Sequence, residues 1–170
     1  MKILIAEDDE DIAFFYKVAL EAREHRLTIT CNGKDCLNVY QKEFEKHAHL
    51  LTSSTPCTIS NKQGVVFDAV ILDYKMPGIN GIEVAKEINK INPKQRIIIS
   101  STYPREVLFH SAIELEENET IEFMQKPFSI DALFDGLEYR RFSLGSHKPK
   151  KDEAVTQVRN HVSAKYVIPF

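Results

Sequence analysis

Five side chains that can do chemistry stand just beyond short apolar runs of the sequence: Glu7, Asp8, Asp73, Ser101 and Lys126. Three carboxylates brought into one cleft repel one another unless a cation neutralises them. Oxygen-only ligands suit a hard ion, and Mg²⁺ is the hard ion that keeps several waters while it bridges to phosphate. A hydroxyl and a lysine beside such an ion can bind the oxygens of a phosphoryl group. These residue types therefore predict a site for Mg²⁺ and a phosphoryl group.

The apolar runs that precede these residues indicate how the side chains come together. The runs are short, rich in β-forming residues and typical of buried strands in a parallel sheet: residues 2–6, 27–31, 68–72, 96–99 and 121–125. In open sheets of alternating strands and helices, ligands bind just beyond the carboxyl ends of the strands. We therefore expect the acids, the hydroxyl and the lysine to converge at that edge of the sheet.

Helical spacing of apolar residues alternates with these runs, over about residues 12–23, 33–46, 84–91, 105–117 and 130–137. Asn80 and Ser129 are the expected N-caps of the third and last of these helices, and Asn92-Pro93 should end the third. Five strand–helix units in succession predict a parallel sheet covered by helices on both faces, because its crossovers are right-handed.

Two segments do not fit this plan. Residues 49–66 are rich in Ser, Thr, Asn and Gln and predict an inserted loop before the third strand. Residues 142–170 begin like a linker and continue as a short basic extension. Valines at positions 155, 158 and 162 recur at helical spacing there, so a short amphipathic helix is expected. Whether it packs on this domain, on a second copy or on another protein stays open.

The net charge of −3 divides unevenly along the chain. Residues from 142 onward have a balance of +3, so residues 1–141 carry −6. A basic tail can contact nucleic acid or an acidic partner, although a solvated extension is the commoner case. The first apolar run is broken too early for a signal peptide, and no run has the length of a membrane span. Three cysteines without metal-ligand spacing fit reduced thiols, so we expect a cytoplasmic protein.

Four ordered motifs resemble the receiver domain of two-component response regulators, in its stand-alone, chemotaxis-regulator-like form. They are Ile3-Leu4-Ile5-Ala6-Glu7-Asp8-Asp9, Ile71-Leu72-Asp73-Tyr74-Lys75-Met76-Pro77-Gly78-Ile79-Asn80-Gly81, the Ser101 step and Lys126-Pro127-Phe128. The resemblance covers residues 1–141, apart from the inserted loop at 49–66. It implies a flavodoxin-like, doubly wound, five-stranded parallel sheet of strand order 2-1-3-4-5, with residues 142–170 as a C-terminal extension.

The resemblance also implies a role for each matching residue. Asp73 would accept a phosphoryl group from a sensor histidine kinase, and Lys126 would pair with Asp73 before the reaction and with a phosphate oxygen after it. Asp8 would bind Mg²⁺ directly and Glu7 through water, while Asp73 and the backbone carbonyl of Lys75 would complete the ligands. The chain would thus be a signalling phosphoacceptor, with no enzymatic activity beyond its own phosphorylation and autodephosphorylation.

Ser101 and Phe123 match the family's switch residues, which would turn inward on phosphorylation and reshape the surface of the fourth helix, fifth strand and last helix. Ser101 could instead only cap a turn, and Phe123 could be permanent core. Thr102 departs from the family, because the residue after the switch hydroxyl is usually small. Tyr103 and Lys75 flank the path of an attacking water, so we expect slow autodephosphorylation.

The function predicted from the sequence is a response regulator that acts through protein contacts, with a histidine kinase upstream and a target or phosphotransfer protein downstream. A tail of about 29 residues is too short for a helix-turn-helix output domain. One alternative is a scaffold that uses the fold without phosphorylation, and another is a phosphorelay intermediate. Nucleic-acid binding through the basic tail is a weaker alternative, since the tail has few aromatics for stacking, among them Tyr166 and Phe170. Phosphotransfer to small substrates is weaker still, because no substrate motif is present.

Overall fold

The computed structural model describes residues 1–53, 65–104, 108 and 120–143. Within them lies a five-stranded parallel sheet of order β2-β1-β3-β4-β5, as the sequence predicted. Each strand has five residues: β1 Lys2–Ala6, β2 Arg26–Thr30, β3 Ala69–Asp73, β4 Ile97–Ser101 and β5 Ile121–Gln125. The three central strands are almost completely buried, which is why their sequences are near-continuous apolar runs.

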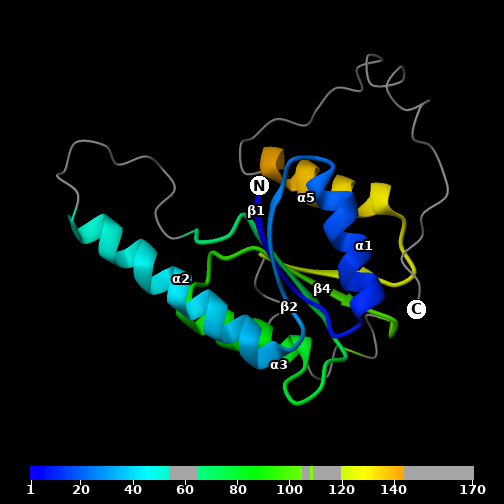
Figure 1. The fold of residues 1–170 in the computed structure, drawn as a ribbon, viewed down its shortest axis with the longest axis horizontal. Coiled ribbons are helices and arrows are strands. Elements are labelled where there is room, and N and C mark those ends of the chain that lie inside the picture. The colour runs from blue at the N-terminus through cyan, green and yellow to red at the C-terminus, as the bar shows by residue number, and fades with distance from the viewer. Residues whose placement is uncertain (54–64, 105–107, 109–119, 144–170) are drawn as a thin grey trace. The chain divides into compact units, whose positions relative to one another are not determined.

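The chain forms two compact units, residues 1–126 and 127–170. The first unit holds the whole sheet and the helices α1 (Glu10–Glu21), α2 (Gly33–Ser53) and α3 (Gly81–Ile91). Figure 1 shows α1 on one face of this sheet and the pair α2 and α3 on the other. The predicted two-sided cover is therefore confirmed. The second unit contains α5 (Ile130–Ser143), where the backbone N–H of Ala132 donates to the predicted cap, Ser129.

Alternation along the strands divides the core of the first unit in two. The side that α2 and α3 cover holds a cluster that includes Leu4, Ala6, Val70, Leu72, Ile97 and Ile99. The intervening buried residues Ile3, Ile5, Ile71 and Ile98 must face α1, which buries Ile12, Tyr16 and Leu20. The side chains that follow these two sets at the carboxyl ends of the strands therefore also point to opposite faces.

The end of α2 differs from the sequence prediction. The helix was expected to end near Lys46, but it continues to Ser53, so residues 49–53 are helix rather than part of an inserted loop. No glycine or proline interrupts the chain between Gly33 and Pro56, and Ala48, Leu50 and Leu51 are good helix formers. Residues 54–64 of the predicted loop lie outside the described residues.

Three further boundaries can be compared. Helix α5 runs to Ser143, so the first two residues of the predicted linker are helical, and residues 144–170 lie outside the described part. The predicted helix over 105–117 also lies outside it, apart from Leu108, which is helical and buried. Helix α3 ends as predicted at its C-cap Asn92.

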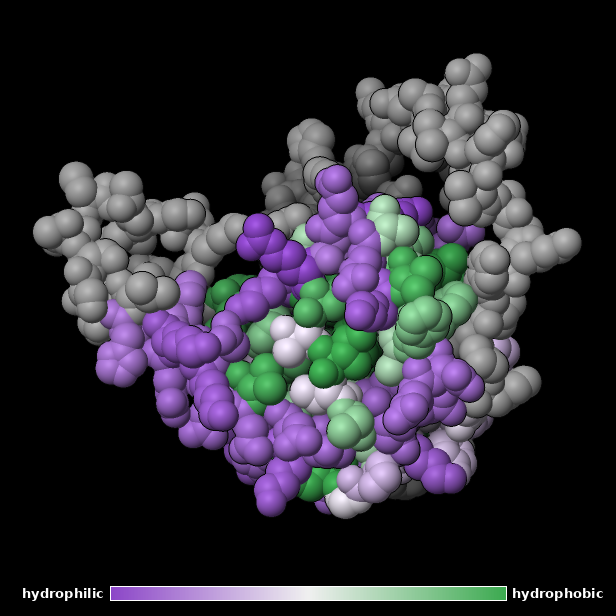
Figure 2. All heavy atoms as spheres, viewed as in Figure 1, coloured by the Kyte–Doolittle hydropathy of each residue, from purple (hydrophilic) through white to green (hydrophobic). Residues whose placement is uncertain are grey.

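The face of the molecule seen in Figure 2 has an apolar centre with hydrophilic side chains around it. The edge strand β2 crosses this centre, and its residues from Leu27 to Thr30 are half-buried. Phe14 and Val18 of α1 are exposed. Among the described helices, none has the length and apolarity that crossing a bilayer would require.

Candidate functional site

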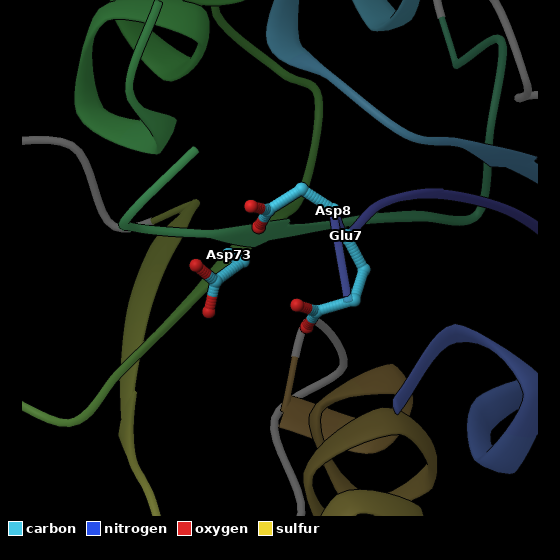
Figure 3. Close-up of side chains that lie close together, drawn as sticks. All are labelled: Glu7, Asp8 and Asp73. Atoms are coloured by element: carbon cyan, nitrogen blue, oxygen red, sulfur yellow. The ribbon is translucent and has the colours of Figure 1, made fainter. Parts of the chain in front are cut away.

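Three carboxylates meet where β1 and β3 end. Glu7, Asp8 and Asp73 each offer an oxygen within 4.8 Å of the others, and no second such group of acids, histidines and cysteines occurs in the described residues. Figure 3 shows Asp8 and Glu7 leaving the end of β1 in different directions, with Asp73 beside them. Asp8 is exposed, whereas Glu7 and Asp73 are buried. The sequence-predicted acids therefore do converge.

The ammonium group of Lys126 lies between two of these acids. Lys126 Nζ donates to Asp73 Oδ1 at 2.6 Å and to Glu7 Oε2 at 3.0 Å. Its own exposure is only 4%, with 3% for Glu7 and 8% for Asp73. Lys126 follows β5, and its backbone N–H donates to the carbonyl of Ser101 at 2.7 Å. The pairing of β5 with β4 therefore fixes the position of the Lys126 backbone. One cation thus balances only part of the charge of three acids.

The pKa of Glu7 responds both to burial and to the neighbouring charges. Burial first, and then the nearby charge of Asp73, raise it from 4.5 to about 7, although Lys126 opposes both effects. The pKa of Lys126 is raised: burial alone would lower it, but the hydrogen bond to Asp73 and the charges of both acids outweigh that effect. An additional cation would relieve the repulsion that remains, and the all-oxygen donor set fits a hard one such as Mg²⁺.

The loop after β3 holds Asp73 in position. The backbone N–H of Lys75 donates to Asp73 Oδ2 at 2.7 Å, so each carboxylate oxygen of Asp73 has a donor. The loop then turns into α3 through a capping box, in which Asn80 accepts from Glu83 N–H while the Glu83 carboxylate accepts from Asn80 N–H. Gly81 packs so closely on Asp73 that a Cβ there would collide with the Asp73 backbone carbonyl.

The other residues of the predicted site lie around this centre. Ser101 ends β4 and is buried, and its Oγ accepts from the backbone N–H of Tyr103 at 3.0 Å. Thr102 and Tyr103 are exposed, and the Tyr103 ring packs edge-on against Tyr74 with 5.8 Å between centroids. Phe123 is half-buried and packs on the core that α2 and α3 cover.

Sequence reasoning missed two polar residues beneath the acids. Ser100 pairs with Asp73 in the register of β3 and β4, and Tyr16 is completely buried on the inner side of α1. The sequence showed Tyr16 only as one position of an apolar helical stripe and Ser100 only as the start of a hydroxyl-rich turn. Strand register combined with side-chain alternation could have placed Ser100 beside Asp73.

A cavity of about 330 Å³ opens next to Asp8 at the ends of β1 and β2. Its walls are formed by Glu7, Asp8, Glu10, Ala13, Ile29, Thr30, Cys31 and Asp35. The acid cluster is therefore open to solvent on the side of Asp8, while Glu7 and Lys126 remain buried. Of the cysteines, Cys31 and Cys36 are both free.

Comparison with known proteins gives one matching family model. Residues 3–138 match the response regulator receiver domain. This range includes the three acids, Ser101 and Lys126.

Individual relatives agree with this match. Sporulation initiation phosphotransferase F of Bacillus subtilis is 26% identical over 137 residues, which cover 81% of this chain and 90% of that protein. Sensory transduction protein LytT of Oceanobacillus iheyensis is 34% identical over 164 residues, covering 92% of this chain but only 55% of LytT. The response regulator TrrA of Thermotoga maritima, solved in complex with Mg²⁺ and BeF, superposes with a TM-score of 0.54 at 25% identity, covering 81% of this chain and 96% of TrrA.

Proposed function

The chain belongs to the response regulator receiver domain family, and we propose that it accepts a phosphoryl group on Asp73 from the phosphohistidine of a sensor histidine kinase. The observation that carries this proposal is the placement of Asp73 between a buried ammonium group and two further carboxylates. A carboxylate is a weak nucleophile, so it needs neighbours that hold it and that balance the charge of the incoming group.

The residues fit a divalent cation, and we propose Mg²⁺. The carboxylates of Asp8 and Asp73, the backbone carbonyl of Lys75 and, through water, Glu7 would hold it. A bound Mg²⁺ would supply positive charge to the oxygens of the transferring phosphoryl group. The support is the acid cluster itself, together with the pKa of Glu7, which burial and then the charge of Asp73 raise.

In the transfer, a carboxylate oxygen of Asp73 attacks phosphorus in line with the bond to the leaving nitrogen. The new O–P bond forms as the P–N bond of phosphohistidine breaks, and the bonding electron pair stays on the imidazole nitrogen. The N–H of Lys75 and the ammonium of Lys126 orient Asp73 before the attack. Afterwards Lys126 can turn from the phosphorylated carboxylate, now an acyl phosphate, to a phosphoryl oxygen.

We propose that Ser101 reports the phosphorylated state. Its Oγ accepts a hydrogen bond from Tyr103 N–H, so the hydroxyl keeps its own proton for a phosphoryl oxygen. An inward turn of the Ser101 side chain would break its hydrogen bond with Tyr103. The half-buried Phe123 ring would then repack. The surface that β5 presents would then change and contact a downstream protein target.

A phosphorelay intermediate is the second candidate. The observation in its favour is the relative named a phosphotransferase, because the match covers 90% of that protein. In a relay, phospho-Asp73 would return its phosphoryl group to a histidine of another protein. A scaffold that does not use phosphorylation is less well supported, since a buried group of like charges is costly unless it binds something. A cytoplasmic location is part of the proposal, because the kinase's phosphohistidine must reach Asp73.

The test is phosphorylation in vitro. The protein is incubated with Mg²⁺ and acetyl phosphate, and its intact mass is compared with that of Asp73→Asn. We expect a gain of one phosphoryl group that requires Mg²⁺ and is absent from the variant. With labelled acetyl phosphate as the donor, an unlabelled histidine phosphotransfer protein added afterwards distinguishes the relay, which passes label to its histidine, from the terminal switch.

Asp68→Asn is the matched control. Asp68 precedes the same strand but lies at its other end, where its carboxylate accepts from the backbone N–H of Lys2 at 2.7 Å. This variant should gain the phosphoryl group as the wild type does. A folded wild-type protein that gains no mass from acetyl phosphate or from any histidine kinase would overturn the proposal in favour of the scaffold.

A further inference from the structure

One buried hydroxyl group under the acid cluster has no role in the proposed transfer. Tyr16 is 0% exposed, and its hydroxyl makes no hydrogen bond of normal geometry within the described residues. Leaving a buried hydroxyl unpaired is unfavourable, and a phenylalanine in its place would avoid the loss. We therefore expect the Tyr16 hydroxyl to form a hydrogen bond in another state of the protein, such as the phosphorylated one.

Strand register places three polar side chains over Tyr16. Ala6 pairs with Leu72, so the next residues, Glu7 and Asp73, are neighbours, and Asp73 in turn pairs with Ser100. All three follow the set of strand residues that faces α1, the helix that carries Tyr16. Figure 3 shows the Glu7 carboxylate directed to this side of the sheet.

Electrostatics agrees with this placement. The pKa of the Tyr16 phenol is raised, mainly by burial and further by the negative charges of Glu7 and Asp73, while the Ser100 hydroxyl opposes the rise. The phenol therefore keeps its proton and can act as a donor.

The hydrogen-bond donors around the Glu7 carboxylate change during the proposed reaction. In this structure its carboxylate accepts from Lys126 at 3.0 Å. A phosphoryl group on Asp73 carries close to two negative charges and is the stronger attractor for the ammonium group of Lys126. When Lys126 turns to it, Glu7 loses that side-chain donor and keeps the backbone of Asp9 and the water through which it would hold Mg²⁺.

We propose that Tyr16 is a positioning residue of the phosphorylated state, an inference that rests on the proposed function. Its hydroxyl donates to the Glu7 carboxylate when Lys126 leaves Glu7 for the phosphoryl group. Tyr16 then keeps Glu7 oriented towards the metal side of the site and replaces the hydrogen bond that the buried carboxylate loses when Lys126 moves. The residue touches neither the phosphoryl group nor the kinase, so it acts only through Glu7.

The test compares Tyr16→Phe with Tyr40→Phe. Tyr40 is the matched control because it is also fully buried, but its hydroxyl bonds to Gln95 and Asn92 beneath the other face of the sheet. For each protein, three quantities are measured: the urea midpoint without ligand, the Mg²⁺ midpoint, and the midpoint for beryllofluoride, a stable mimic of the phosphoryl group, at saturating Mg²⁺.

We expect Tyr16→Phe to bind beryllofluoride about tenfold more weakly, the size of one hydrogen bond to a charged acceptor. Its Mg²⁺ midpoint should stay near that of the wild type. Its urea midpoint should equal or exceed that of the wild type, because the substitution removes a buried hydroxyl that is unpaired until Lys126 moves. Tyr40→Phe should show the reverse: a lower urea midpoint and an unchanged beryllofluoride midpoint. Unchanged beryllofluoride binding in Tyr16→Phe, or a loss that falls equally on all three quantities, would overturn the inference.

A measurement on the wild-type protein does not depend on the variant's folding. With ¹³C at the Cζ of tyrosine, the Tyr16 resonance should shift when beryllofluoride is added, as its hydroxyl gains a carboxylate acceptor, and the Tyr40 resonance should not. A Tyr16 resonance that stays fixed while beryllofluoride binds refutes the inference and leaves the proposed function intact. Failure of the wild type to bind beryllofluoride at all refutes both.

Discussion

Replacing Glu7 by glutamine should make the metal-free protein more stable at neutral and alkaline pH. Glu7 is 3% exposed, and its pKa is raised from 4.5 to about 7, chiefly by burial and then by the charge of Asp73. Glutamine keeps the shape and can still accept from Lys126, but it carries no charge. The substitution therefore removes the unfavourable ionisation while leaving the Lys126–Asp73 pair in place.

The magnitude follows from the difference between the folded and unfolded pKa of Glu7. A rise from 4.5 to about 7, at 1.36 kcal/mol per pKa unit, amounts to about 3 kcal/mol. Because the folded pKa is the higher one, the folded state binds more protons between these values, and the free energy of unfolding falls as the pH rises through that window. Below pH 4.5 the two proteins should be equally stable, and above pH 8 the variant should be more stable by about 3 kcal/mol.

The assay is urea unfolding followed by far-ultraviolet circular dichroism, at pH values from 4 to 8.5 with EDTA present. Glu43→Gln is the control, because hydrogen bonds to Lys2 and Lys46 lower the pKa of Glu43 to about 2. Stability that depends on that shift is lost only as the pH falls below about 4.5, so between pH 5 and 8 this variant should differ from wild type by a constant amount.

Two results would refute the reasoning about Glu7. One is a difference between wild type and Glu7→Gln that does not change between pH 5 and 8. The other is a wild type that is the more stable protein at pH 8 without metal. At pH 8, saturating Mg²⁺ should reduce the difference in free energy of unfolding between Glu7→Gln and the wild type. The wild type binds the ion more tightly and so gains more stability by mass action.

Four further substitutions are expected to act in distinct ways. Lys126→Met should lower the free energy of unfolding by about 3–5 kcal/mol in urea titrations, because it leaves two buried carboxylates without a cation, and Mg²⁺ should recover part of the loss. Gly81→Ala should abolish phosphorylation measured by intact mass, since its Cβ collides with the backbone of Asp73, whereas Asn80→Ala should cost about 1 kcal/mol as a lost cap and still be phosphorylated. Tyr103→Ala should shorten the phosphoryl lifetime measured by acid quench, because we expect the wild-type ring, which is 42% exposed, to restrict attacking water; an unchanged lifetime contradicts that role.

Local patterns in the sequence were enough to predict the strands of the sheet and their order along the chain. Apolar runs that stop at charged residues predict buried parallel strands and their ends, and β1 and β5 begin and end where the sequence predicted. The cap Asn80 and the stop at Asn92 are likewise local signals, because capping depends on side chains within a few residues. The convergence of Glu7, Asp8 and Asp73 was predictable because parallel strands share one carboxyl edge.

The interactions between these side chains depend on tertiary contacts, which could not be predicted from the sequence pattern. The length of α2 was misjudged because polar composition does not end a helix in the absence of glycine or proline. The position of Lys126 between Glu7 and Asp73 depends on contacts between residues more than fifty positions apart. The role of Tyr16 was hidden because helical periodicity distinguishes buried from exposed positions but cannot say which strand residues a buried hydroxyl will face. Strand register supplies that information, and it exists only once the strands have paired.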